Sequence, residues 1–564
     1  MRFRNWVVGG FDRERAVDFC RHGVNPLVSV FLASRGTEDI EAVRDMLGDG
    51  QGEIHDPFLL TDMDKAVSKI RSAIQSGQKV AIYGDYDVDG MTSSVLLARW
   101  LRRAGAEFEI YIPARFGEGY GLNISAIDAL KAKDIGLIIT VDCGITAVEE
   151  VEYAKGLGID IIITDHHECR DELPQAVAVI DPKRPDCNYP NKVLAGVGVA
   201  FKLVCALEND IASDEIFRVY GDLVAIGTIA DVMPVTGENR ELIRQGLQVL
   251  NKQPAPGLLR LFKEVGVEPG KATASTVGFT IAPRLNAAGR MGQTNLSLDL
   301  LLTDDHDNAL SLAIELCQLN LQRRSLESEI FEEAIAMLEH MSIDGPIILS
   351  KRGWYQGVTG IVAAKLAERY RVPTIIISVD DSGMGRGSCR SFGSFAIFDA
   401  LCSCSDILET FGGHEMAVGL SIAEANIDVL QQKMNDFYLS DIGSMPPPEL
   451  KLDFEVLKPE LLTVPNIQAL GRLEPFGNGN PSPNLCVMGA ELLQAQSIGA
   501  GKHTKLTLGK AGQNLDCIFF SMPSEDLGVG VGSVVDVAFE PQINEFRGRS
   551  TVQLNLIDIR PSIN

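Results

Sequence analysis

The sequence predicts a multidomain α/β protein with a parallel-sheet domain, a long connecting helix, a second α/β domain and a C-terminal β-barrel. Strand and helix patterns alternate over residues 46–260, which indicates βαβ units and a parallel sheet. The alternation weakens after residue 260 and returns over residues 345–440. Residues 449–564 alternate in short strands, a pattern typical of a small barrel of the OB-fold kind.

Length and composition agree with several globular domains. A chain of 564 residues with 45% hydrophobic content is long enough for three or four domains with large cores. We expect no membrane segment and no secretory signal, because no apolar run is long enough for either. The eleven cysteines are scattered, and only Cys402 and Cys404 are close together, so we expect a reducing, cytoplasmic compartment.

The net charge of −25 excludes a generic nucleic-acid coat protein, since phosphate binding depends on lysine and arginine. A nuclease with a local basic channel is still compatible with this charge. Part of the acidity could then serve as metal ligands.

Residues 1–45 are predicted to be a helical lead-in. The first α/β domain begins after them, and its strands are predicted at Val80–Tyr83, Phe108–Ile112, Leu137–Val141, Ile161–Thr164 and Ala176–Ile180. Each strand ends in a polar or glycine-rich loop. Because parallel strands put their carboxyl ends at one edge of a sheet, these loops are expected to lie together.

The loop after the first strand contains three alternating acids, Asp85, Asp87 and Asp89. Carboxylates this close repel one another unless protons or a cation neutralise them, which favours a divalent-metal site. An EF-hand loop is an alternative, but that loop needs a glutamate at its twelfth position, where this chain has Leu96. A solvated acidic turn without function is a second alternative.

Later loops repeat the theme. Asp142 follows one strand, and Asp165 with the adjacent pair His166 and His167 follows the next. A further acid, Asp231, stands among apolar residues, where a carboxylate needs a partner or a metal. Imidazole with carboxylate suits manganese, iron or zinc, whereas magnesium prefers oxygen. Each residue alone also has a structural interpretation, and Asp231 could simply be a helix cap.

A long helix over Asn308–Met337 is predicted to connect two domains, and the segment before it carries Arg284 and Arg290. In the second α/β domain, Arg386, Ser388 and Arg390 are expected on a strand and turn that grip phosphate. The segment Phe411–Glu415 is interpreted as a glycine loop entering a helix, where backbone N–H groups would face an anion. For Arg284 and Arg290 the alternative is that they serve only the solubility of the surface.

Residues 445–448 are predicted to form a proline-rich linker. The barrel strands that follow are predicted at Leu485–Met488, Lys505–Leu508, Asp516–Phe520, Val534–Phe539 and Thr551–Ile559. Such a barrel would bind single strands through charge and stacking, with Lys502 and Arg547 among the candidate contacts. Because the region is not net basic, a purely structural barrel stays open.

Four motifs resemble those of the DHH phosphoesterase superfamily: Gly84-Asp-Tyr-Asp-Val-Asp-Gly90, Val141-Asp-Cys-Gly144, Thr164-Asp-His-His167 and Gly227-Thr-Ile-Ala-Asp231. Further segments narrow the resemblance to the RecJ family of single-strand-specific exonucleases, namely residues 116–122, 194–201, 282–290, 353–360 and 412–417. The resemblance runs from about residue 45 to the C-terminus. It implies a DHH catalytic domain over 46–260, a helical connector over 261–344, a DHHA1 domain over 345–440 and an OB-fold-like domain over 449–564.

The resemblance also implies site residues. Two Mn²⁺ or Mg²⁺ ions would be held by Asp87, Asp89, Asp142, His166 and Asp231, and His167 would contact the scissile phosphate. Many superfamily members carry a histidine where this chain has Tyr83, so the second ion is expected to bind more weakly. The substrate would be held by Arg284, Asn286, Arg290, Arg386, Ser388, Arg390, Gly412, Gly413, His414, Lys502 and Arg547.

The expected activity is hydrolysis of single-stranded DNA from the 5′ end to 5′-mononucleotides, in DNA repair and recombination. Expected partners are single-strand-binding protein and a RecQ-type helicase, with no membrane. A phosphodiesterase for short RNA or cyclic dinucleotides is a second hypothesis, but it would not need the barrel. A non-catalytic binding scaffold is a third, and the set of five ligand-type residues argues against it.

Overall fold

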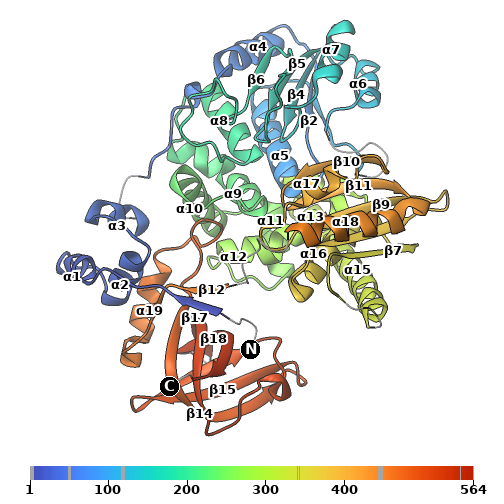
Figure 1. Ribbon diagram of the computed structural model, residues 1–564. Coiled ribbons are helices and arrows are strands. Elements are labelled where there is room, and N and C mark those ends of the chain that lie inside the picture. Colours follow the sequence, from blue (N-terminus) through green and yellow to red (C-terminus); the bar gives the residue numbers. More distant parts are fainter. Residues whose placement is uncertain are drawn as a thin grey trace.

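The computed structural model describes residues 5–48, 52–115, 121–339, 341, 343–441, 449–546 and 548–562. Two α/β units and a β-barrel are joined by helices (Figure 1). Most of the 116–122 motif, the predicted linker at 445–448 and Arg547 lie outside the described residues.

The first unit is built on a five-stranded, fully parallel sheet, as the sequence predicts. Its strands are β2 (Val80–Tyr83), β3 (Phe108–Tyr111), β4 (Leu137–Val141), β5 (Asp160–Thr164) and β6 (Ala178–Ile180), in the order β3-β2-β4-β5-β6. The residues of the strands β2 and β4 are buried on both faces, as expected for a parallel sheet with helices on both sides. All carboxyl ends therefore meet at one edge of the sheet.

Helices cover the two faces of this sheet. One face packs against α4 (Met63–Gln75), α5 (Val88–Arg103) and α8 (Gly196–Glu208), and α9 (Asp214–Ala230) packs on α5 and α8. The other face packs against α6 (Ile124–Lys131) and α7 (Val148–Gly156). The helices α10 (Gly237–Lys252), α11 (Pro256–Glu264), α12 (Ala274–Thr276), α13 (Ala282–Arg290) and α14 (Thr294–Leu302) extend the first core.

The predicted connecting helix is α15, which runs over 33 residues from His306 to Leu338. Its first half packs in the core of the first unit through residues such as Leu316. Its second half packs in the second unit through residues such as Ile330. One continuous helix therefore joins the two units.

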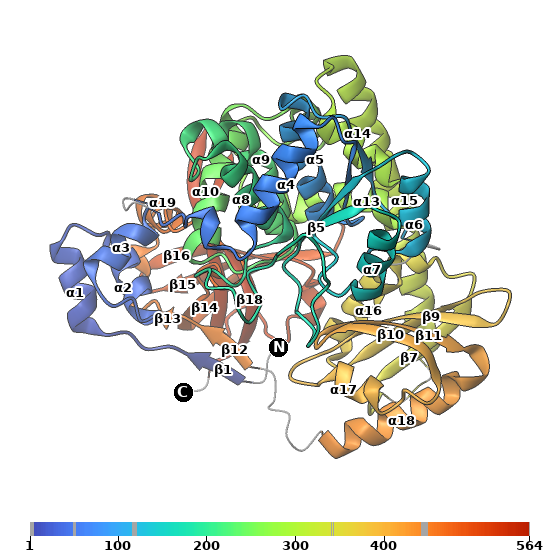
Figure 2. The same cartoon turned by 90° about the horizontal axis from the view of Figure 1, so that it is seen from above.

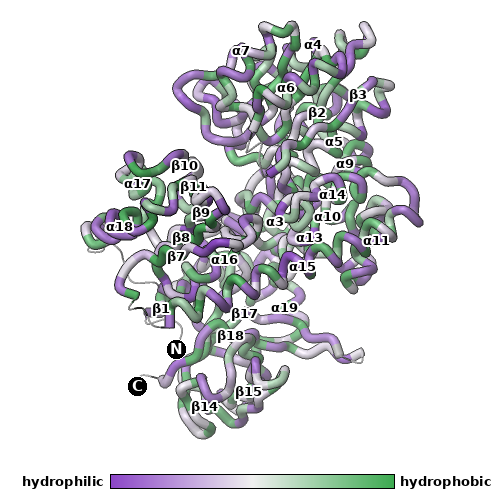
Figure 3. The backbone as a smooth tube through the Cα atoms, turned by 90° about the vertical axis from the view of Figure 1, so that its right-hand side faces the viewer, coloured by the Kyte–Doolittle hydropathy of each residue, from purple (hydrophilic) through white to green (hydrophobic). Residues whose placement is uncertain are grey.

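The second unit has a mixed sheet in the order β10-β11-β9-β8-β7. Its strands are β7 (Ile347–Arg352), β8 (Thr374–Val379), β9 (Met384–Arg390), β10 (Leu408–His414) and β11 (Ala417–Ala423), and its helices are α16 (Gln356–Tyr370), α17 (Ile397–Cys402) and α18 (Ile427–Asp441). In the tube coloured by hydropathy, hydrophobic stretches gather at these strands (Figure 3).

The prediction of a glycine loop entering a helix at residues 411–415 is wrong. These residues lie at the end of β10, which turns back into β11 as an antiparallel hairpin. The apolar residues of β11 alternate, with Val418, Leu420 and Ile422 buried, and this period of two specifies a strand. No helix N-terminus therefore faces an anion at this point of the described chain.

The sheet of the C-terminal barrel contains β13 (Phe454–Glu455), β14 (Leu485–Ile498), β15 (His503–Lys510), β16 (Gln513–Phe519), β17 (Val534–Phe546) and β18 (Arg549–Pro561), with α19 (Val464–Gly471) against it. The strand β12 (Glu449–Leu452) precedes it and belongs to a separate two-stranded sheet. Pairing of β14 with β17 and of β16 with β18 closes the barrel. The five predicted strands correspond to β14–β18.

The first residues of the chain pack on this barrel. The strand β1 (Asn5–Val8) pairs with β12, and Trp6 donates a hydrogen bond from Nε1 to Asp558 at 3.0 Å. The predicted helical lead-in consists of α1 (Arg13–Arg21), α2 (Pro26–Ser34) and α3 (Ile40–Met46), which share the barrel's hydrophobic core. Both ends of the chain therefore lie at the barrel, with α1–α3 beside α19 (Figure 2).

Among the described residues, none of the helices combines the length and the apolar character needed to cross a bilayer.

Candidate metal centre and anion site

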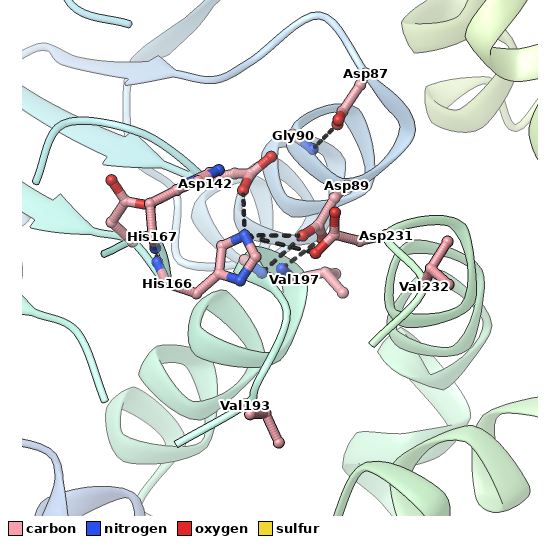
Figure 4. A network of polar contacts seen from close by, with 12 residues as sticks. Asp87, Asp89, Gly90, Asp142, His166, His167, Val193, Val197, Asp231 and Val232 are labelled. Carbon is pink, nitrogen blue, oxygen red and sulfur yellow. Dashed lines mark hydrogen bonds and ion pairs between the residues drawn. The ribbon is translucent and has the colours of Figure 1, made fainter. Parts of the chain in front are cut away.

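Acidic and imidazole side chains gather at the carboxyl edge of the first sheet, as the sequence predicts (Figure 4). Asp85 and Asp87 follow β2, Asp142 follows β4, and His166 follows β5. Asp231 joins them from the C-terminal end of α9. The parallel topology explains the first four, because it brings separate strand ends to one place.

The side chains form three groups whose ligand-type atoms lie within 4.8 Å of one another: Asp89 with His166 and Asp231, Asp142 with His166 and His167, and Asp85 with Asp87 and Asp142. The Nε2 atom of His166 lies 3.1 Å from Asp142, 3.6 Å from Asp231 and 3.9 Å from Asp89. Asp142 belongs both to the group with His166 and to the group with Asp85. This position suits a ligand that bridges two ions.

Asp89 is held by backbone donors. Its two carboxylate oxygens accept hydrogen bonds from the N–H groups of Gly196 at 2.7 Å and Val197 at 2.8 Å, in the first turn of α8. Burial and then the charge of Asp87 nevertheless raise the pKa of Asp89 to about 7. Gly196 is required here, because a Cβ at this position would lie 2.6 Å from the Cβ of Asp142.

Asp87 caps the N-terminus of α5 by accepting a hydrogen bond from the N–H of Gly90 at 3.1 Å. The side-chain oxygen of Asn286, on α13, accepts a hydrogen bond from the N–H of Val88 at 3.2 Å. Asp85 is 4% exposed, and burial followed by the charge of Asp87 raises its pKa well above the usual value. Asp85 therefore belongs to this cluster, although only Asp87 and Asp89 of its motif were expected as ligands.

Asp165 orients His167. Its Oδ1 lies 2.7 Å from Nδ1 of His167, and its Oδ2 accepts a hydrogen bond from the N–H of Ile145 at 2.9 Å. Burial alone would lower the pKa of His167, but the hydrogen bond and the charge of Asp165 raise it to about 9. The outer face of His167 stacks on His414 of β10, with ring centroids 6.0 Å apart and an interplanar angle of 11°.

Asp231 sits at a strained helix end. The helix α9 ends in a Schellman arrangement, in which Val232 N–H donates to Ile229 and Met233 N–H donates to Thr228. The left-handed position of this arrangement usually holds glycine, but here Val232 occupies it with φ of +58°. A β-branched residue in this region costs on the order of 1–3 kcal/mol, so other contacts must hold it.

The cluster fits a divalent metal on its own geometry. Buried polar atoms without a hydrogen-bond partner among the described residues include Asp85 Oδ1, His166 Nε2 and Asp231 Oδ2. Burial, with the charge of His167, lowers the pKa of His166 to about 3, so its imidazole is neutral and can act as a ligand. Burial and the charges of Asp89 and Asp87 raise the pKa of Asp231 to about 8. A bound cation would relieve all of these costs at once.

Positive side chains lie on the other side of the cluster. Burial, with the charges of Arg115 and Arg390, lowers the pKa of Arg290 to about 9. Among the described carboxylates, none forms an ion pair with Arg290 or Arg390. On β9 the side chains of Arg386, Ser388 and Arg390 share one face because they are two residues apart. Buried guanidinium groups of like charge suit a phosphate.

The remaining predicted substrate residues are spread out. Arg284 points back into the helices, where its Nη1 donates to the carbonyl of Thr280 at 2.6 Å. The exposed Gly412, Gly413 and His414 lie on the hairpin strand β10, with His414 reaching His167. Lys502 is exposed in the turn between β14 and β15 of the barrel.

Three domain families match the chain: the N-terminal domain of the DHH family over residues 79–228, the DHHA1 domain over residues 344–439 and the RecJ OB domain over residues 453–558. The single-stranded-DNA-specific exonuclease RecJ of Bacillus subtilis strain 168 is 41% identical over 541 residues, which are 95% of this chain and 68% of that protein. The RecJ of Escherichia coli K12 is 34% identical over 568 residues, 95% of this chain and 96% of that protein.

The chain belongs to the RecJ family. Solved structures of RecJ from Thermus thermophilus share the fold: the complex with Mn²⁺ has a TM-score of 0.85 at 29% identity and covers 100% of this chain and 80% of that chain. The complex with Mg²⁺ has a TM-score of 0.79 at 28% identity and covers 100% and 79%. The expected DHH, DHHA1 and OB-fold architecture is thereby confirmed, and the cluster of acids and imidazoles agrees with a RecJ metal centre.

Sequence reasoning missed three residues of this candidate site. Asp85 stands in the first motif but was not expected as a ligand, and Asp165 was not given its role as the partner of His167. Arg115, which lies over the ring of Tyr86 at 4.8 Å, was not considered. Of these three residues, only Asp85 and Asp165 could have been found from the sequence, because both stand in motifs that follow predicted strands.

Proposed function

We propose that this chain is a divalent-metal-dependent exonuclease that degrades single-stranded DNA from its 5′ end to 5′-mononucleotides. The observation that carries the proposal is the meeting of two opposite sets of groups: carboxylates and imidazoles around Asp142, and guanidinium groups around Arg390. A phosphodiester needs both, because cations activate the reaction while arginines hold the phosphate.

The residues present fit two ions of Mn²⁺ or Mg²⁺. One ion would be held by Asp89, Asp142, His166 and Asp231, and the other by Asp85, Asp87 and Asp142. Bound there, the ions would polarise the phosphodiester and lower the pKa of a water molecule.

The chain's own residues would bind and orient the substrate. His167, protonated and fixed by Asp165, would donate a hydrogen bond to a non-bridging phosphate oxygen. Ser388 and Arg390 of the second unit, together with Arg290 at the end of α13, would grip the end of the strand. Water would then attack the phosphorus atom in line with the 3′-oxygen of the terminal nucleotide. The bond between phosphorus and this 3′-oxygen would break, and the terminal nucleotide would be released.

Family membership supports the choice of substrate, because the B. subtilis and E. coli relatives are named single-stranded-DNA-specific exonucleases. From the same membership we infer the 5′ polarity, a role in DNA repair and recombination, and a cytoplasmic location. Single-strand-binding protein and a RecQ-type helicase are the partners we propose on this basis.

We also propose a division of labour among the domains. Residues 46–260 would carry the metal centre, residues 261–344 would connect, residues 345–440 would hold the end of the substrate, and residues 449–564 would bind the following nucleotides. Residues 1–45 pack on this last domain, so a role in supporting the barrel is the natural one for them.

Two single-stranded oligonucleotides, one labelled at each end, test the proposal in the presence of Mn²⁺ or EDTA. We expect immediate release of mononucleotide from the 5′ label and gradual shortening of the 3′-labelled strand, with no cleavage in EDTA. A fully paired duplex is the substrate control. The Asp142→Asn variant is the protein control, because it keeps the shape of the side chain but removes its charge.

The other outcomes point elsewhere. Release from the 3′ label first would overturn the polarity. Cleavage in EDTA that Asp142→Asn does not abolish would overturn the metal centre. Cleavage of short RNA or cyclic dinucleotides but not of DNA would favour the second phosphodiesterase class.

A further inference from the structure

A loop of the C-terminal region reaches the segment that follows Asp231. This loop, residues 474–480, connects α19 to β14 and is called the 474–480 loop below. The Nδ2 of Asn478 donates a hydrogen bond to the carbonyl of Val232 at 3.1 Å. The N–H of Val235 donates to the carbonyl of Asn478 at 2.6 Å. One asparagine therefore holds both ends of the segment 232–235.

The 474–480 loop is itself fixed. Gly477 and Asn480 exchange two backbone hydrogen bonds, at 2.9 and 3.1 Å, and Gly479, which follows Asn478 in the turn between them, has a φ of +75° that suits glycine. The buried side chain of Asn480 donates to the carbonyls of Leu473 at 3.2 Å and Pro475 at 2.9 Å. Asn478 is thus presented by a tight turn rather than by a free loop.

The helix α10 docks this loop against the first unit. The guanidinium of Arg240 donates to the carbonyls of Glu474 at 3.0 Å and Pro475 at 3.2 Å. Its neighbour Asn239 donates to the carbonyl of Pro234 at 3.1 Å. The same helix turn therefore holds both the 474–480 loop and the segment after Asp231.

The segment needs such support because of Val232. Its side chain is 65% exposed, so packing does not hold its left-handed conformation, and it lies on the side of Asp231 away from His166 (Figure 4). If Val232 relaxed to an ordinary conformation, the two hydrogen bonds that close α9 would break. The last turn of α9, which carries Asp231, would then fray.

We propose that Asn478 is a positioning residue of the metal centre, which fixes Asp231 by holding Val232 in its left-handed conformation. The C-terminal region is thereby part of the catalytic centre, although it contributes no ligand. This inference rests on the proposed function, since it requires Asp231 to bind an ion.

The test is the dissociation constant of Mn²⁺ for the full chain without DNA, measured from the electron paramagnetic resonance of free Mn²⁺. We expect Asn478→Ala to raise it about 10-fold, the lower end of the range for residues that support a metal ligand. Adding Val232→Gly should bring it back to within about threefold of the original chain, because glycine adopts the left-handed region without help.

The matched control is Asn466→Ala. Asn466 also donates an amide hydrogen bond, to the carbonyl of Leu461 at 2.7 Å, but it lies in α19 and its bonds stay away from the segment after Asp231. We expect no change in Mn²⁺ binding for this variant. Thermal unfolding of each variant shows that it is folded, which the exposed position of Asn478 favours.

Failure of the inference and failure of the proposed function give different results. If the original chain binds Mn²⁺ and Asn478→Ala binds it equally well, Asn478 does not position Asp231, while the proposed function stands. If Asn478→Ala binds weakly and Val232→Gly gives no recovery, the route through Val232 is wrong. If the original chain binds no Mn²⁺, the metal centre and this inference are both wrong.

Discussion

The two α/β units meet at one site but supply opposite chemistry. The first provides acids and imidazoles that are almost fully buried, such as Asp89 at 1% and His166 at 4% exposure. The second provides arginines and a serine along β9, with Arg386 exposed to solvent. Metal ligands must be held without freedom, because small displacements ruin coordination, whereas a polymer substrate needs an open surface to enter.

Burial acts on the two sides in the same way but with opposite sign. It raises the pKa of Asp89 to about 7 and that of Asp231 to about 8 in the first unit, and it lowers the pKa of Arg390 in the second. In each case the charged form is disfavoured until a partner of opposite charge arrives. A bound cation would stabilise the charged form of the acids, and a bound phosphate would stabilise the charged form of the arginines.

The strongest test of this contrast removes a metal ligand. We expect Asp142→Asn or His166→Ala to lower the rate of cleavage by about 1,000-fold or more, because positioning by the arginines cannot replace activation by the ions. The rate is measured at saturating single-stranded DNA with Mn²⁺, and unfolding curves check that the fold persists. Activity within about 10-fold of the original chain would show that these side chains are not ligands.

A smaller effect is expected from Asp165→Asn. The amide no longer fixes the tautomer and charge of His167, so we expect kcat to fall about 100-fold with little change in DNA affinity. Asp181→Asn is the matched control, because burial, followed by the charge of Asp165, raises the pKa of Asp181 to about 8 and leaves it largely neutral near pH 7. Equal losses in both variants would mean that the effect is structural.

On the basic side, Arg390→Gln should weaken binding of single-stranded DNA about 10-fold, as expected for a charged hydrogen bond to phosphate. Arg386→Gln, at an exposed position of the same face, should weaken it only about two- to threefold, since solvent screens the charge. Both values come from anisotropy titrations in Ca²⁺ at fixed ionic strength. A larger loss in kcat than in affinity would show that Arg390 acts mainly in the chemical step, as the metal ligands do, and not in binding DNA.

The smallest effect concerns the metal-free protein. The folded-state pKa of Asp231, about 8, lies above the unfolded value of about 3.9, so its contribution to stability is lost as pH rises from about 4 to 8. In EDTA we expect the melting temperature to fall by about 5 °C between about pH 6 and 8. Asp231→Asn should reduce this dependence, and the raised pKa values of Asp89 and His167 should maintain the remainder of it. A melting temperature that rises with pH in EDTA would contradict the assignment.

The sequence predicted the first unit closely, because its strands are short, apolar and bounded by glycine or polar loops. Val80–Tyr83 and Leu137–Val141 were predicted with the bounds they have. The hairpin at 408–423 was not, since Gly412 and Gly413 suggest a loop, and their strand β10 becomes visible only through its pairing with β11. Arg284 donates a hydrogen bond to the carbonyl of Thr280, and its contact with the substrate stays a prediction.

The sequence alone determined which kinds of side chain the site contains. It shows acids at strand ends, a pair of adjacent histidines and a set of motifs in a fixed order. These features are local patterns in the sequence, so they can be recognised without the tertiary structure. The tertiary structure decided which of these side chains meet. It placed Asp231 on the end of α9, gave Asp165 its role as the partner of His167, and brought Asn478 of the C-terminal region to Val232. Asp165 and His167 are neighbours in sequence, but the contacts of Asp231 with His166 and of Asn478 with Val232 join residues far apart in the chain, and only packing fixes them.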